Sequence, residues 1–173
     1  MKALSLWQPF PTVIATGHKT SETRSWPAPA SLIGERLGVH AAKRALPAED
    51  WPARLVDVVA NALGLEDLLA CDEPAAALLS ELVYGAMMAT VTVTACRQVV
   101  AHDRIRGGSR GQVELPVAVL DAGGGARTSV LIDGLGDYSI GRWVWQFGGR
   151  EALDPPVPVR GAQGLWEWRG ASR

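Results

Sequence analysis

Three ionisable side chains of different kinds lie within six residues of one another, at Lys19, Glu22 and Arg24. On a strand, Glu22 and Arg24 would point to the same side, because side chains alternate and these two are two residues apart. A carboxylate can accept a hydrogen bond from an exocyclic amine, and a guanidinium can bind a phosphate or a carbonyl. The segment could therefore bind the edge of a nucleobase. The simpler interpretation is a surface ion pair, which contributes little to stability.

Two tryptophans near this segment could supply a stacking surface. Stacking of a base on an aromatic ring contributes about 1–3 kcal/mol. Trp7 belongs to a predicted strand, so we expect it in the core, where tryptophan is common. Trp26 stands in a loop flanked by prolines, where a core position is less natural. We therefore expect Trp26, rather than Trp7, to contact a ligand.

Three further polar residues are candidate ligand contacts. His40 either contacts a ligand or forms hydrogen bonds within the core, and the sequence favours neither. Lys43 follows the same predicted strand and is expected at the mouth of a cleft or in solvent. Gln163 lies in a Gly-Ala-Gln-Gly turn, where its amide either pairs with a base or only satisfies the turn.

Arginines and glycines are interspersed around residue 107, with Arg104, Arg106 and Arg110 as the cationic members. In a loop, these arginines could bind a phosphate backbone. A solvated loop is the more common explanation of such a segment.

Composition places the chain among ordinary globular proteins, with 47% hydrophobic and 20% charged residues. A formal net charge of −1 argues against a protein that coats nucleic acid non-specifically, but not against a pocket with a few local cations. Cys71 and Cys96 share no zinc-binding spacing with the histidines, so we expect no metal and no cofactor. The sequence has no apolar run of membrane-spanning length and no signal-peptide core, so we expect no membrane association and a cytoplasmic location.

Hydrophobic periodicity and turn residues predict many short strands and few helices. Strands are expected at residues 3–7, 20–24, 37–42, 89–95, 113–120, 129–132, 142–147 and 165–169. A short helix is expected over residues 12–16, and a helical insertion over about residues 50–82. Because there is no regular alternation of strand and helix and no long linker, we predict a single α+β domain over residues 1–173.

Four segments occur in the order that is typical of one family. They are Leu4–Phe10 (LSLWQPF), Gly17–Trp26 (GHKTSETRSW), Val39–Lys43 (VHAAK), and the terminal pair Trp143–Trp145 with Gly161–Trp166. Together they resemble the ASCH domain family, a branch of the PUA-like superfamily. The helical insertion and the arginine- and glycine-containing segment match no motif of that family.

The resemblance implies a PUA-like β-barrel with flanking helices and a cleft beside the barrel. In related modules that cleft faces RNA or a modified base. It thus implies a module that binds nucleic acid or a nucleotide and holds a base, modified or not, in the cleft. The implied partners are single-stranded RNA or DNA, or a free modified nucleoside. The residues assigned to ligand binding are Lys19, Glu22, Arg24, Trp26, His40, Lys43 and Gln163.

Two other functions remain open. Some compact members of the family resemble amidohydrolases that deacylate N4-acylated cytosine nucleosides, and their catalytic lysine corresponds to Lys19. The threonine of that pattern is Glu22 here. A catalytic lysine also needs a lowered pKa, whereas a neighbouring carboxylate keeps a lysine charged. We therefore rank binding above catalysis, and a protein-interaction adaptor third.

Overall fold

The computed structural model describes residues 1–107 and 113–170. The strands are β1 (Lys2–Gln8), β2 (Ser21–Arg24), β3 (Arg36–Ala45), β4 (Ala86–Gly107), β5 (Val113–Gly123), β6 (Ala126–Leu131), β7 (Trp143–Pro158) and β8 (Leu165–Glu167). The α-helices are α1 (Phe10–Ala15), α2 (Ala53–Leu63) and α3 (Pro74–Ser80), with 3₁₀ turns at Ala30–Leu32, Ala48–Asp50 and Glu66–Ala70.

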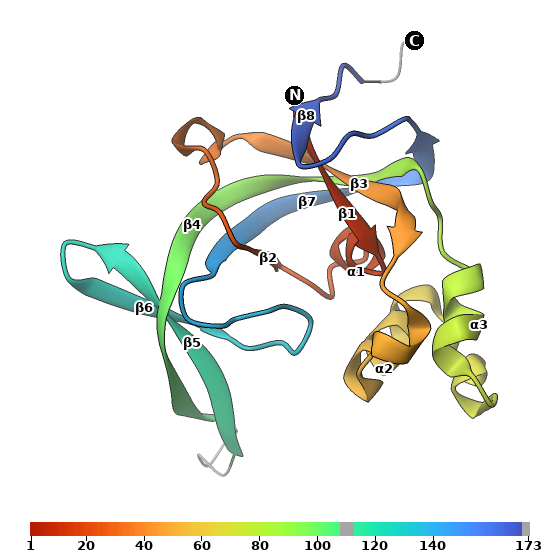
Figure 1. The fold of residues 1–173 in the computed structure, drawn as a ribbon, viewed down its shortest axis with the longest axis horizontal. Coiled ribbons are helices and arrows are strands. Elements are labelled where there is room, and N and C mark those ends of the chain that lie inside the picture. The colour runs from red at the N-terminus through yellow and green to blue at the C-terminus, as the bar shows by residue number, and fades with distance from the viewer. Residues whose placement is uncertain (108–112, 171–173) are drawn as a thin grey trace.

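The sheet curls around the core in the strand order β2-β7-β4-β3-β1-β8 (Figure 1). Strand β1 runs parallel to β3 and antiparallel to β8, and β2 pairs only with β7 among the described strands. The long strand β4 continues beyond this sheet and pairs with β5, which in turn pairs with β6. The predicted α+β, PUA-like barrel architecture is confirmed.

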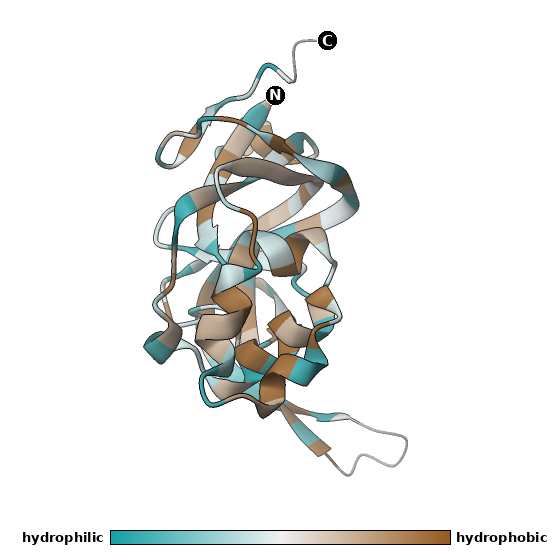
Figure 2. Cartoon of the chain, turned by 90° about the vertical axis from the view of Figure 1, so that its right-hand side faces the viewer, coloured by the Kyte–Doolittle hydropathy of each residue, from teal (hydrophilic) through white to brown (hydrophobic). Residues whose placement is uncertain are grey.

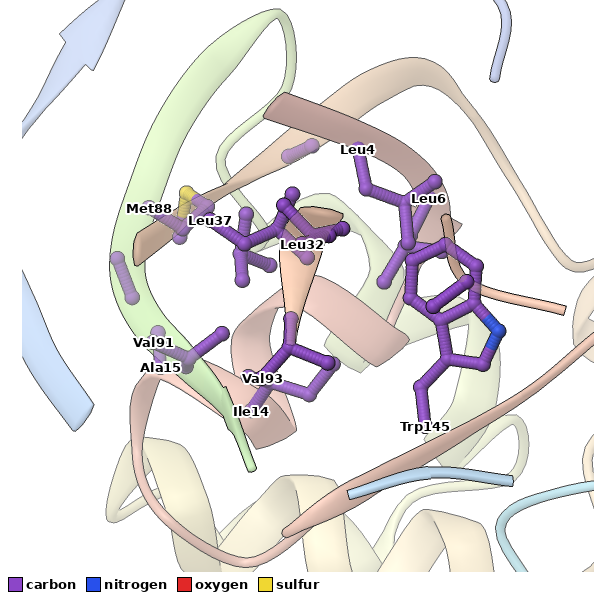
Figure 3. Packing of buried hydrophobic residues seen from close by; sticks show 14 of the residues in the cluster. Leu4, Leu6, Ile14, Ala15, Leu32, Leu37, Met88, Val91, Val93 and Trp145 are labelled. Atoms are coloured by element: carbon purple, nitrogen blue, oxygen red, sulfur yellow. The ribbon is translucent and has the colours of Figure 1, made fainter. Parts of the chain in front are cut away.

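The main core lies inside the curled sheet. Strand β1 contributes Leu4 and Leu6, β4 contributes Val91 and Val93, and Trp145 of β7 is fully buried beside them. Figure 3 shows these side chains converging from strands on different sides of the barrel. Burial of large apolar side chains contributes about 1.5–3 kcal/mol each, so this cluster anchors the strands that carry the polar residues.

The helical insertion expected over about residues 50–82 is present as α2, α3 and the 3₁₀ turns beside them. Gly64 ends α2 in the left-handed conformation, as the sequence indicates. Leu55, Val59 and Leu78 are buried against Val13 of α1, which forms a second core. Figure 2 shows that both helices carry hydrophobic as well as hydrophilic residues. Among the described helices, none combines the length and the apolar character of a membrane span.

The prediction of a loop around residue 107 is wrong for the residues up to Gly107, which belong to β4. Arg104 and Arg106 belong to β4, where they pair in register with Pro116 and Glu114 of β5. The strand predicted over residues 89–95 thus lies within the first half of a 22-residue strand. Arg110 lies outside the described residues.

Candidate functional site

A cavity of about 1340 Å³ opens beside the barrel, at the end of strands β1, β2 and β3. The segment between β7 and β8 forms its opposite wall. Its lining residues are Ser5, Leu6, Trp7, Phe10, Glu22, Arg24, His40, Ala42, Lys43, Arg44, Gly85, Pro158, Val159, Arg160, Gly161, Ala162, Gln163 and Gly164. Five of the seven predicted ligand-binding residues are among them: Glu22, Arg24, His40, Lys43 and Gln163.

Strand β2 places Glu22 and Arg24 in the cavity because its side chains alternate. The expectation that these two residues face the same way agrees with this placement. Their side chains form an ion pair, with 3.8 Å between Arg24 Nη1 and Glu22 Oε1. Main-chain pairing of β2 with Trp143–Gln146 of β7 fixes the strand, so this pair is held by the sheet rather than by a loop.

Three other polar residues of the same segment, Lys19, Ser21 and Thr23, are bonded within the protein. Lys19 is fully buried and donates a hydrogen bond to the Leu135 carbonyl at 3.0 Å. Ser21 bonds to the Tyr138 hydroxyl at 3.0 Å, and Thr23 accepts from the Asp137 amide at 2.9 Å.

These three contacts tie β2 to the connection between β6 and β7. Gly136 fits there because a Cβ at its position would lie 3.0 Å from Thr23 Oγ1. Lys19 is not among the described residues that line the cavity, but its Nζ lies behind two residues that are, 4.0 Å from Glu22 Oε2 and 5.8 Å from the centre of the Phe10 ring.

Glu22 is the buried acid of the cavity, with its side chain only 10% exposed. Lys19 Nζ lies 4.0 Å from Oε2, and the hydrogen bonds among the described residues include no donor to either carboxylate oxygen. Among the described residues, no side-chain oxygen that is closed off from solvent lacks a hydrogen-bond partner. Because the two Glu22 oxygens have no such partner, both must remain accessible to solvent. Burial raises the pKa of Glu22, against the opposing effect of Lys19 and Arg24.

The two tryptophans exchange their predicted positions. Trp7 is 49% exposed and lines the cavity, so the prediction that it lies in the core is wrong. Its neighbours Leu4 and Leu6 face the interior, and alternation along β1 turns residue 7 outward.

Trp26 lies outside the described lining. Its ring packs edge-on against Trp145, with 4.8 Å between ring centroids. The Arg24 guanidinium lies 5.6 Å from the centre of the Trp26 ring. Trp26 therefore reaches the cavity only through Arg24.

His40 is fixed by bonds at both ring nitrogens. Nδ1 lies 3.0 Å from the Ser5 hydroxyl, and Nε2 lies 3.1 Å from the Val159 carbonyl. Because a carbonyl only accepts, Nε2 carries the proton, so Nδ1 accepts from Ser5, which itself accepts from Trp166 Nε1 at 3.1 Å.

Burial lowers the pKa of His40, which favours this neutral ring. A Cβ on Gly161 would lie 2.3 Å from the His40 ring, so the two residues fit only because position 161 is glycine. His40 lines the cavity and holds its far wall in place.

The lining of the cavity carries more cations than anions. The described lining contains a single carboxylate, Glu22, and four cations: Arg24, Lys43, Arg44 and Arg160. Lys43 is exposed, as expected, and Gln163 is exposed on the opposite wall.

Sequence reasoning missed Arg44, Arg160 and Phe10, which also line the cavity. Arg160 stands next to the Gly-Ala-Gln-Gly turn, a neighbourhood that could have indicated it. The described residues contain no cluster of three or more side chains suited to hold a metal ion.

The ASCH domain model matches residues 4–107 of the chain. The match includes β1 from Leu4 onward, β2 and β3 with their cavity-lining residues, the helical insertion, and β4. Three of the four segments that suggested the family fall within it, whereas the terminal pair lies beyond it. No curated protein matches the chain. Because the matched segment is more than half of the 173 residues, the chain belongs to the ASCH domain family.

Proposed function

We propose that this chain is a nucleic-acid or nucleotide-binding module that holds one base, modified or not, in the cavity beside the barrel. Membership of the ASCH family supports an RNA-binding or related module in general. The observation that carries the finer proposal is the Glu22 carboxylate. It is nearly buried, faces the cavity, and has no hydrogen-bond donor among the described residues. Burying a polar group without a partner is unfavourable, so such a carboxylate is suited to a ligand donor.

The surrounding residues supply the other contacts that a nucleotide needs. Trp7 offers an exposed aromatic face for stacking, and Phe10 is a second aromatic residue in the lining. Lys43, Arg44 and Arg160 are placed to bind the phosphates of a nucleotide or of a single strand. The local excess of cations over one carboxylate provides attraction for an anion although the whole chain is slightly acidic.

The observations favour binding over catalysis at this site. A lysine acting on an N4-acylated cytosine nucleoside must reach the acyl group, and the Lys19 side chain is fully buried with its ammonium group bonded to the Leu135 carbonyl. Glu22 also stands where the amidohydrolase pattern has threonine. A role as a protein-interaction adaptor ranks below both, because the cavity lining carries four cationic side chains and a carboxylate.

The test is a titration with short single-stranded RNA and DNA and with free nucleosides, including acylated cytidines. Isothermal titration calorimetry reports binding, because its signal does not depend on Trp7, the exposed cavity residue that the variants replace. Chromatography of the same samples reports turnover. We expect binding without turnover, at least tenfold weaker in Trp7→Ala and only slightly weaker in Trp7→Phe, which keeps an aromatic face.

Charge is tested with matched variants. Lys43→Ala should weaken the binding of single strands and reduce its salt dependence, because one phosphate contact is lost. Arg104→Ala removes the same charge from β4, where Arg104 pairs with Glu114 at 3.3 Å, and should leave binding unchanged. Release of free cytidine from an acylated substrate would overturn the proposal in favour of the amidohydrolase. Absence of binding to every ligand would also overturn it.

A further inference from the structure

The polar edge of the cavity has an order that can distinguish one base from another. Arg24 Nη1 lies 3.8 Å from Glu22 Oε1, whereas Oε2 lies on the Lys19 side, 4.0 Å from Nζ. The order across this edge is therefore a guanidinium donor, then one carboxylate acceptor, then a second. Lys19 is a poor donor to a ligand because it is fully buried and bonded to the Leu135 carbonyl.

Both carboxylate oxygens are open to a ligand. Neither receives a hydrogen bond from the described residues, and both keep contact with solvent. An ionised carboxylate only accepts, so its two parallel oxygens are best matched by two N–H groups on neighbouring atoms. A ligand with a single N–H on that edge would leave one oxygen without a donor in a nearly closed site.

We propose that the cavity selects guanine, whose Watson–Crick edge presents O6, N1–H and the 2-amino group in that order. This inference rests on the proposed base-binding function. Arg24 donates to O6, while the two oxygens of Glu22 accept from N1 and from the 2-amino group. Adenine and cytosine present one exocyclic amine beside a ring acceptor, and uracil presents one N–H between two carbonyls. None of these three edges offers two neighbouring donors. The base must be unpaired, since the edge it presents is the pairing edge.

The remaining parts of the site are compatible with a guanine nucleotide. Stacking on Trp7 is tolerant of base identity, so it adds affinity without selection. The Arg24 guanidinium also lies 5.6 Å from the centre of the Trp26 ring, a cation–π contact that favours one orientation of the donor. Selection then depends on Glu22 and Arg24 alone.

The experiment compares the 5′-monophosphates of guanosine, inosine, adenosine, cytidine and uridine by quenching of tryptophan fluorescence at neutral pH. We expect the guanosine nucleotide to bind at least tenfold more tightly than the other four. Inosine lacks only the 2-amino group, and the loss of one hydrogen bond to a charged acceptor corresponds to about a tenfold change. Methylation of guanine at N1 should weaken binding by at least as much, because it removes a donor and adds bulk against Glu22.

Glu22→Gln provides the decisive variant. Glutamine offers one acceptor and one donor, which matches the edges of adenine and cytosine. The preference should therefore move from guanosine to adenosine or cytidine nucleotides, while Thr94→Val, a substitution outside the cavity, should leave it unchanged. Equal or tighter binding of another base to the native protein overturns the guanine assignment but leaves base binding in place. Failure of all five nucleotides to bind overturns both.

Discussion

The two faces of the segment around β2 differ in what their polar side chains do. Lys19, Ser21 and Thr23 each bond to the connection between β6 and β7. On the opposite face, Glu22 and Arg24 pair loosely with each other at 3.8 Å and look into the cavity. One face is satisfied within the protein, and the other is left open for a ligand. Polar residues that serve stability and polar residues that serve binding therefore alternate along one short strand.

The largest expected effect on stability is at Lys19, one of the residues that bond to the connection between β6 and β7; we call these residues the closed face. Lys19→Met keeps most of the side-chain volume but leaves Asp133 and Glu22 without the buried cation that faces them at 3.8 and 4.0 Å. Removing one partner from a buried ion pair costs about 3–5 kcal/mol. We expect the free energy of unfolding, measured with urea at neutral pH, to fall by about 3 kcal/mol.

Lys43→Met is the matched control for this measurement. The same substitution at an exposed cavity residue should change the free energy of unfolding by less than about 0.5 kcal/mol. If Lys19→Met were as stable as the native chain, the contacts of Lys19 would not stabilise the fold. The contrast between residues that serve stability and residues that serve binding would then not hold.

Much of this contrast follows from alternation, which the sequence contains. The period that groups Glu22 with Arg24 on β2 also turns Trp7 of β1 away from Leu4 and Leu6, whereas Lys19 precedes β2 and its burial does not follow from alternation along the strand. The sequence prediction applied this alternation to Glu22 and Arg24 but not to Trp7. It assigned Lys19 to the same site because the three charged residues lie within six positions of one another.

Other features depend on contacts between residues far apart in the chain. The Leu135 carbonyl that holds Lys19 is 116 residues away, and the Val159 carbonyl that holds His40 is 119 residues away. No local pattern specifies such partners. Strands and the helical insertion were predictable from periodicity, whereas the pairing of β2 with β7, which sets the cavity wall, was not.

The second largest effect is expected at His40, a cavity residue that resembles the closed face because both ring nitrogens are bonded. His40→Gln should lower the free energy of unfolding by about 2 kcal/mol at neutral pH, since the amide cannot reproduce both bonds. Burial lowers the pKa of His40, so the unfolded chain binds its proton more readily than the folded one.

The native protein should therefore lose this part of its stability as the pH falls through the ordinary histidine value of 6.5. That loss should be absent from His40→Gln, which urea unfolding at several pH values would measure. A native protein whose pH profile between neutral and acidic pH matched that of the variant would show that His40 is not held in its neutral form.

A smaller effect is expected at Thr23. Thr23→Val keeps the shape of the side chain but removes the oxygen that accepts from the Asp137 amide. The loss of one such hydrogen bond costs about 1 kcal/mol. Hydrogen exchange should become faster at the Asp137 amide, while base binding stays unchanged because Thr23 faces away from the cavity.

Thr94→Val, at an exposed threonine that donates to the Gln146 carbonyl, is the control and should change stability by less than about 0.5 kcal/mol. Weakened base binding in Thr23→Val would mean that the two faces of β2 are coupled rather than independent.

The smallest effect on stability, and the opposite in sign, is expected at Glu22. Its pKa is raised mainly by burial, so the ionised carboxylate is disfavoured in the folded state despite Lys19 and Arg24. Glu22→Gln should then leave the free energy of unfolding equal or up to about 1 kcal/mol higher at neutral pH. The native carboxyl is neutral in both states below the ordinary glutamate value of 4.5, so this advantage should shrink as the pH falls toward it. Urea unfolding of both proteins across that range measures the difference in their free energies of unfolding.

A clear loss of stability in the variant at neutral pH would make Glu22 a structural partner of Lys19. A higher free energy of unfolding together with an altered base preference would show that Glu22 serves ligand binding and lowers the stability of the fold.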